Sequence, residues 1–213
     1  MVKYIIRDKE ILIMLNKLVR KFAVFITYIY YNIKYRIKGV GIENVPESGG
    51  VIICANHRKA EDPILLYHAY KKRWINFFAK KALTDSKFKN WLICDVCGVK
   101  AVQHSGADIS AVKWGVSKLK GGEVVGIFPE GTRNRTDADL LELEHGAAFI
   151  AHMSKAKVVT ATINCSRKFF SKCEVIFSRP LELEEFYSER LNDDVKMQIT
   201  QKIKESILKS LKK

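Results

Sequence analysis

The 213-residue sequence has little of what defines several protein classes. Four prolines and twelve glycines are too few for a collagen-like or low-complexity chain. Five cysteines, an odd number without a recognisable signal peptide, do not make a disulfide framework and indicate a reduced compartment on the cytosolic side. Cys94 and Cys97 form a C-x-x-C pair, but no second Cys or His pair lies at zinc spacing. We therefore predict no metal site.

The sequence also lacks a long uninterrupted apolar run. Its longest, residues 22–31, is about half of the roughly twenty residues that a membrane-spanning helix needs, and Lys17, Arg20 and Lys21 interrupt any longer window. Residues 1–39 nevertheless carry nine basic and two acidic side chains, which is +7 of the net charge of +14. This pattern favours one or two helices lying in the interface of an anionic membrane. A helix packed on its own domain and a short or tilted spanning segment are the alternatives.

Residues 40–213 have the pattern of one α/β domain. Short apolar runs suited to buried strands alternate with segments of helical spacing, and no repeat or long linker divides them. This alternation predicts a largely parallel central sheet flanked by helices. The expected strands are residues 51–54, 74–79, 99–102, 124–128, 158–164 and 173–177, and the expected helices are residues 63–70, 83–94, 109–119, 143–153 and 193–213.

Ligands of such sheets bind beyond the carboxyl ends of strands, and the first unusual strand exit contains Asn56, His57 and Asp62. A spacing of five residues separates two side chains by about 140° on one helix, so a turn must bring His57 and Asp62 together. Pro63 suits the first turn of a helix, which places Asp62 at its start. Asp62 can then orient the His57 ring as in a general-base dyad. The alternatives are a helix cap for Asp62 and an ordinary loop histidine for His57.

The second unusual exit is the segment Phe-Pro-Glu-Gly-Thr-Arg, residues 128–133. Arginine side chains and loop N–H groups are the groups that bind phosphate. A solvated polar turn accounts for Arg133 but not for Glu130 and Gly131 between it and an apolar strand. We therefore expect a phosphate-binding loop.

Together the two exits resemble the glycerolipid acyltransferase family, in particular its bacterial members that acylate lysophosphatidic acid. The resemblance covers about residues 40–165, and its specific part is residues 128–133. It implies a glycerol-3-phosphate acyltransferase-like fold. It also implies transfer of a fatty acyl group from coenzyme A or acyl carrier protein to the free hydroxyl of 1-acyl-sn-glycerol 3-phosphate. The product is phosphatidic acid, and no cofactor is needed beyond the acyl thioester.

The resemblance also implies roles for single residues. His57 is the general base that deprotonates the acceptor hydroxyl, Asp62 orients the imidazole, and no acyl-enzyme forms. The implied substrate contacts are Asn56, Glu130, Gly131, Thr132 and Arg133, with Arg133 near the acceptor phosphate. No serine or cysteine stands beside His57, since the nearest thiol lies three residues back on an apolar strand, where it should be inert.

The sequence departs from the family pattern at three places. His104 stands where an arginine usually helps to bind the acceptor phosphate, and Lys100 is a candidate to compensate. Residues 157–160 replace a proline-rich stretch, and His145 replaces a basic residue before a glycine. These changes leave other acceptors open: glycerol 3-phosphate, another lysophospholipid or a lyso-aminolipid.

The expected partners are an anionic membrane surface, a lysophospholipid acceptor and an acyl thioester, at the cytoplasmic face of the membrane. A different class of function, a non-catalytic basic module that binds membranes or nucleic acid, explains the charge but not the two strand exits. An inactive relative is a third possibility, against which the presence of both His57 and Asp62 argues. Nucleic acid is not an expected partner, because no such motif is present and the aromatic residues gather in the apolar amino terminus.

Overall fold

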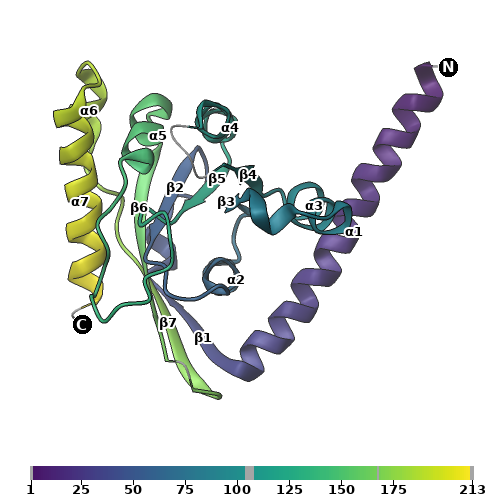
Figure 1. The fold of residues 1–213 in the computed structure, drawn as a ribbon, viewed down its shortest axis with the longest axis horizontal. Coiled ribbons are helices and arrows are strands. Elements are labelled where there is room, and N and C mark those ends of the chain that lie inside the picture. The colour runs from purple at the N-terminus through teal and green to yellow at the C-terminus, as the bar shows by residue number, and fades with distance from the viewer. Residues whose placement is uncertain (1, 104–107, 167, 212–213) are drawn as a thin grey trace.

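The protein is an α/β structure built on one seven-stranded sheet (Figure 1). The computed structural model describes residues 2–103, 108–166 and 168–211, with side chains from residue 10 onward, so His104 lies outside the described residues. All neighbouring strands are parallel except β6 and β7, which confirms the predicted largely parallel sheet. The strands, in sheet order, are β1 (Tyr35–Val40), β7 (Ser171–Phe177), β6 (Lys157–Cys165), β2 (Val51–Ala55), β5 (Val124–Ile127), β3 (Ile75–Lys80) and β4 (Lys100–Val102).

Helices cover both faces of the sheet. One face is covered by α2, and the other by α4, α5 and α7 (Figure 1). The other helices that the structure describes are two short 3₁₀ helices, one π-helix, the short helices α3 and α6, and the long α1. The bounds are α1 (Val2–Lys34), η1 (Ile42–Asn44), α2 (Asp62–Tyr70), η2 (Lys81–Thr84), α3 (Lys87–Asn90), η3 (Trp91–Val96), α4 (Ile109–Lys120), α5 (Gly146–Ser154), α6 (Glu184–Ser188) and α7 (Asp193–Leu211).

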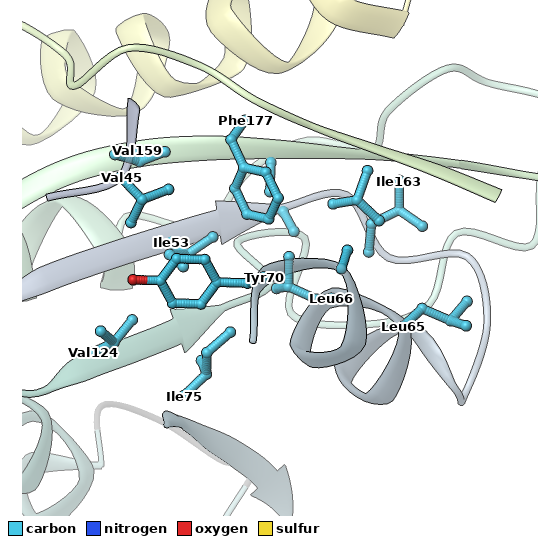
Figure 2. Packing of buried hydrophobic residues seen from close by; sticks show 14 of the residues in the cluster. Val45, Ile53, Leu65, Leu66, Tyr70, Ile75, Val124, Val159, Ile163 and Phe177 are labelled. Carbon is cyan, nitrogen blue, oxygen red and sulfur yellow. The ribbon is translucent and has the colours of Figure 1, made fainter. Parts of the chain in front are cut away.

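The central strand β2 is buried on both faces, so its residues are apolar without alternation. Ile53 belongs to the cluster under α2, where Leu65, Leu66 and Tyr70 are fully or almost fully buried (Figure 2). Burial of each such leucine contributes about 1.5–3 kcal/mol. This packing fixes α2, and therefore Asp62 at its first position, against the end of β2.

Three expectations need correction. Residues 35–39, assigned to the amino-terminal segment, form most of β1, which pairs with β7 along the sheet edge and buries Tyr35. The predicted helix over residues 83–94 is divided into η2, α3 and η3. Helix α6 was not expected, because five residues are too few for a helical period to be recognised.

The amino-terminal segment is one continuous helix, α1, which projects from the domain (Figure 1). Its inner side is docked: Arg20 lies 4.6 Å from the centre of the Trp74 ring, and Thr27 Oγ1 lies 3.1 Å from His68 Nε2. Among the described residues, no helix contains a stretch both long and apolar enough to cross a membrane. Large apolar residues are exposed along α1: Ile11, Leu12, Ile13, Met14, Leu15, Leu18, Phe22, Phe25, Ile26, Tyr28, Ile29, Tyr30 and Ile33.

Candidate active site

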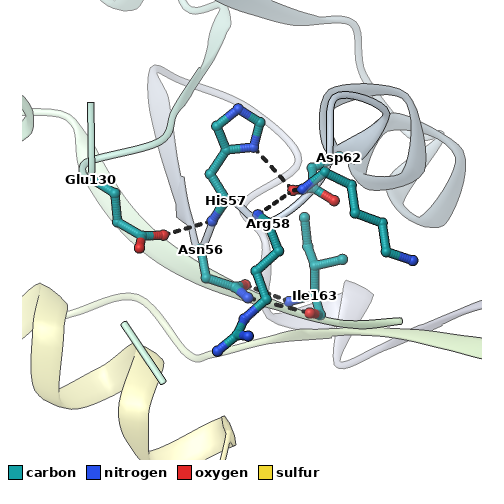
Figure 3. Close-up of polar contacts among 7 residues, drawn as sticks. Asn56, His57, Arg58, Asp62, Glu130 and Ile163 are labelled. Atoms are coloured by element: carbon teal, nitrogen blue, oxygen red, sulfur yellow. Dashed lines mark hydrogen bonds and ion pairs between the residues drawn. The ribbon is translucent and has the colours of Figure 1, made fainter. Parts of the chain in front are cut away.

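The predicted pair of His57 and Asp62 is present beyond the carboxyl end of β2. His57 Nδ1 lies 3.0 Å from Asp62 Oδ2 (Figure 3). The Asp62 side chain is 2% exposed and the His57 side chain 18%. The turn that the spacing required is formed by the loop between β2 and α2, which confirms the predicted geometry.

The carboxylate of Asp62 binds this loop rather than capping α2. Its Oδ2 atom accepts hydrogen bonds from the backbone N–H groups of Arg58 and Lys59, both at 2.7 Å. Because a carboxylate oxygen only accepts, Nδ1 of His57 must carry the hydrogen in the bond to Asp62. In the neutral ring the lone pair is then on Nε2. No described residue forms a hydrogen bond with Nε2, so this atom is available to take a proton.

The second strand exit supports the His57 ring and backbone. The ring stacks on Phe128 with 4.3 Å between centroids. The His57 N–H donates to Glu130 Oε1 at 2.7 Å (Figure 3). The His57 carbonyl accepts from the Asn134 N–H at 2.7 Å. The loops after β2 and β5 therefore form one hydrogen-bonded unit.

Glu130 has a supporting position rather than the exposed one expected of a substrate contact. It is 4% exposed, and its second oxygen accepts from the Leu141 N–H at 2.9 Å. Burial raises the pKa of Glu130, while the N–H groups of Leu141 and His57 act in the opposite direction. Both oxygens thus bind backbone, and the carboxylate joins the loop of His57 to the segment around residue 141.

Asn56 also differs from its predicted role. Its side-chain oxygen accepts from the Ile163 N–H at 2.7 Å and its amide nitrogen donates to the Ile163 carbonyl at 3.3 Å (Figure 3). With 1% exposure it offers no surface to a substrate. Asn56 instead extends the pairing of β2 with β6 by one residue and sets where the chain leaves the sheet.

The three residues that follow Glu130 in the loop after β5 are less buried than Glu130. Gly131 has φ +63°, a left-handed conformation that glycine adopts without strain, so glycine is favoured at this position. Thr132 and Arg133 are exposed. Arg133 forms no hydrogen bond or ion pair with any described residue, so its guanidinium is free to bind an anion.

Lys100 lies away from the dyad. It begins β4 at the edge of the sheet, two strands beyond β5, and pairs in register with Phe78, whose ring packs on Trp114 of α4. The His57 ring instead lies on Phe128, which packs on the α2 face of the sheet. Lys100 is therefore on the opposite face of the sheet from the His57 ring.

Three features of the site were missed by sequence reasoning. Asn134 and Leu141 support it through backbone N–H groups, which no sequence motif reports. Lys59 reaches the Ser166 carbonyl at 2.6 Å, which ties the loop to the end of β6. A cavity of about 250 Å³ lies behind the loop, lined by Arg58, Lys59, Asp62, Asp139, Ile163, Asn164, Cys165 and Leu211.

The cysteine nearest to His57 in the sequence, Cys54, offers no nucleophile. Burial raises the pKa of the Cys54 thiol to about 12, which keeps it protonated, as expected for its position on the apolar strand. Cys94 and Cys97 are free thiols, and among the described residues no group of three or more His, Cys, Asp and Glu side chains is placed to hold a metal ion. The dyad is the group equipped for proton transfer.

Known proteins are similar to this chain in both sequence and fold. The acyltransferase family model matches residues 36–164. A 1-acyl-sn-glycerol-3-phosphate acyltransferase of Bacillus subtilis is 30% identical over 173 residues, covering 78% of this chain and 84% of the relative. The enzyme of that name from Borreliella burgdorferi is 29% identical over 182 residues, covering 76% and 70%.

A solved structure, the lysophosphatidic acid acyltransferase PlsC of Thermotoga maritima, superimposes with a TM-score of 0.67 over 91% of this chain and 80% of that one. At 20% identity this likeness shows the fold. The family match, by contrast, covers more than half of the chain and includes both strand exits. The chain therefore belongs to the acyltransferase family.

Proposed function

We propose that this acyltransferase moves an acyl group from a thioester of coenzyme A or acyl carrier protein to the free hydroxyl of 1-acyl-sn-glycerol 3-phosphate, forming phosphatidic acid. The single observation that carries the chemistry is the His57 ring, bonded through Nδ1 to a buried carboxylate and unpartnered at Nε2 among the described residues. The names of the curated relatives support the choice of acceptor.

The proposed reaction is a direct transfer. His57 Nε2 takes the proton of the acceptor hydroxyl as its oxygen attacks the thioester carbonyl carbon. Asp62 stabilises the resulting imidazolium through Nδ1. The carbon–sulfur bond then breaks, the carbonyl re-forms, and the thiolate leaves as a thiol with the proton that His57 held. The thioester already activates the acyl group, so we expect this sequence to need no cofactor.

We propose that the loop after β5 holds the phosphate of the acceptor. Arg133 is exposed and unpartnered among the described residues, and a guanidinium can grip a phosphate with two parallel hydrogen bonds. Thr132 is exposed beside it and offers a hydroxyl donor. Glu130 at the root of the same loop binds the His57 backbone, so a phosphate on this loop is held at a set position relative to the base.

We also propose that the protein acts at the cytoplasmic face of an anionic membrane. Isoleucine, leucine and phenylalanine side chains are exposed along α1, and residues 1–39 carry a net charge of +7. An apolar helix face with basic neighbours binds an anionic interface by both burial and charge. The lipid acceptor would then arrive along the membrane and the thioester from the water.

One assay tests the reaction and the acceptor together. Thiol release from an acyl thioester is measured with lysophosphatidate, glycerol 3-phosphate, lysophosphatidylethanolamine and monoacylglycerol as separate acceptors. We expect release to be fastest with lysophosphatidate and to require His57. Equal release with every acceptor, or none with any, would overturn the proposal.

A further inference from the structure

The turn between β6 and β7 exposes two aromatic side chains. Phe169 is 61% exposed and Phe170 is 66% exposed. Their rings contact each other edge to face, with 5.9 Å between centroids. Two adjacent phenylalanines held in water gain no burial, so the folded domain alone does not explain them.

The backbone conformation makes a phenylalanine at position 170 more unusual still. Phe170 has φ +57°, a left-handed conformation in which glycine or asparagine is favoured and a bulky side chain is an outlier. The conformation is held because the Phe170 N–H donates to the Lys34 carbonyl at 2.8 Å. A strained residue with an exposed ring indicates that the ring has a role outside the chain.

The turn lies where the proposed membrane surface meets the active site. Lys34 is the last residue of α1, so its hydrogen bond with Phe170 places the turn beside the carboxyl end of that helix (Figure 1). Ile33, the residue before Lys34, is 55% exposed. On its other side, Ser166 accepts the hydrogen bond from Lys59, two residues after His57. The turn therefore connects directly to the end of α1 and to the loop of the general base.

Basic side chains around the turn indicate an anionic partner. Four basic residues are exposed on the turn, on β7 and on the edge strand β1: Lys168, Lys172, Arg36 and Lys38. One of them, Lys172, is paired, with Glu174 at 2.8 Å. Aromatic side chains among basic ones match an anionic lipid surface, where the rings enter the apolar boundary and the cations meet the headgroups.

We propose that the β6–β7 turn is a second contact with the anionic phospholipid bilayer, in which Phe169 and Phe170 insert beside the carboxyl end of α1. This inference rests on the proposed membrane association of the enzyme. A helix alone leaves the domain free to rotate about the helix axis, whereas a second contact at its end restricts that rotation. The turn thereby orients the loop of His57 relative to the lipid that carries the acceptor.

Vesicle binding of the full-length protein tests the proposal. The variant combines Phe169→Ser with Phe170→Asn, because asparagine accepts the left-handed backbone and keeps the turn. The matched control combines Ile109→Ser with Met197→Ser, which removes two exposed apolar side chains from α4 and α7. With vesicles of phosphatidylglycerol and phosphatidylcholine, we expect the turn variant to bind at least about tenfold more weakly than the wild type. We expect the control to bind as the wild type does.

Quenching by brominated lipids locates the turn independently. We expect a tryptophan introduced by Phe169→Trp to add emission that brominated acyl chains quench, and one introduced by Met197→Trp to add emission that they do not. Equal vesicle binding by the turn variant, or no quenching at position 169, would overturn the second contact. Loss of binding to acyl carrier protein with unchanged vesicle binding would overturn it in favour of a protein contact.

The same experiment separates this inference from the proposed function. If the wild type does not float with vesicles, both the second contact and the membrane part of the proposed function are wrong. Thiol release with a soluble short-chain lysophosphatidate reports the chemistry alone. We expect the turn variant to keep this activity while its activity on vesicle-borne acceptor falls.

Discussion

The two loops that form the candidate site are built in opposite ways. In the loop after β2, one oxygen of Asp62 receives the ring of His57 and the N–H groups of Arg58 and Lys59. In the loop after β5, Glu130 and Asn134 bind the His57 backbone on either side of Arg133, whose own side chain has no partner among the described residues. The side chain that does the chemistry in the first loop is therefore held by a hydrogen bond, whereas the cation of the second loop is free.

The difference matches what each loop has to do. A general base works only when its nitrogen lies within hydrogen-bond reach of the proton it removes, and a misplacement of about 1 Å can cost about 10² in rate. A phosphate-binding side chain, by contrast, has to keep its donors free for a ligand that arrives from outside the protein. Glu130 joins the two, since it is the root of the second loop and the support of the first.

The largest effect should come from removing the general base in the loop after β2. We expect His57→Ala to lower kcat/KM by about 10²–10⁴, because the acceptor hydroxyl loses its base, while the variant stays folded. Thiol release and thermal unfolding measure the two quantities. His152→Ala, which removes another partly exposed imidazole from α5, is the control and should keep near-normal turnover. Near-normal turnover in a folded His57→Ala protein would refute the mechanism.

A smaller effect should come from weakening the support that Glu130 gives to the His57 loop. Glutamine has one acceptor oxygen, so in Glu130→Gln an amide NH₂ would face either the His57 or the Leu141 N–H. We expect kcat to fall about 100-fold with little change in the KM of the acceptor, and stability to fall by about 1–3 kcal/mol.

Glu142→Gln, on an exposed neighbour, is the matched control for that substitution. Steady-state kinetics and urea unfolding provide the readouts. A raised acceptor KM with unchanged kcat in Glu130→Gln would instead show that Glu130 touches the acceptor, as the resemblance implied.

The smallest effect should come from the open loop. A charge-assisted hydrogen bond is worth about 1.5–3 kcal/mol. Because the loop is exposed, we expect the bond between Arg133 and a phosphate to contribute at the low end of that range. We expect Arg133→Ala to raise the KM of lysophosphatidate about tenfold and to leave the KM of the acyl donor unchanged. Arg135→Ala on the same loop is the control. If monoacylglycerol, which has no phosphate, shows the same rise, Arg133 binds something other than phosphate.

Sequence reasoning succeeded where the signal was local. Apolar runs marked β2, β5 and β6, and the helical period marked α4 and α7, because burial imposes those patterns directly. The sequence also predicted that a turn joins His57 to Asp62, from the proline at the start of α2. It failed for β1, whose alternating basic and apolar residues continue the charge pattern of α1. Its pairing with β7 is visible only in the fold.

Most strands and helices of the domain, the pairing of His57 with Asp62 and the loop of residues 128–133 were thus predictable from the sequence alone, through hydrophobic periodicity and a specific motif. The tertiary structure decided which of these residues keep their polar atoms free. Asn56 and Glu130 bind backbone groups of Ile163 and of His57 and Leu141, so they are supports. Hydrogen bonds between distant segments form only when the sheet assembles, and they use up the polar atoms that a motif presents as free.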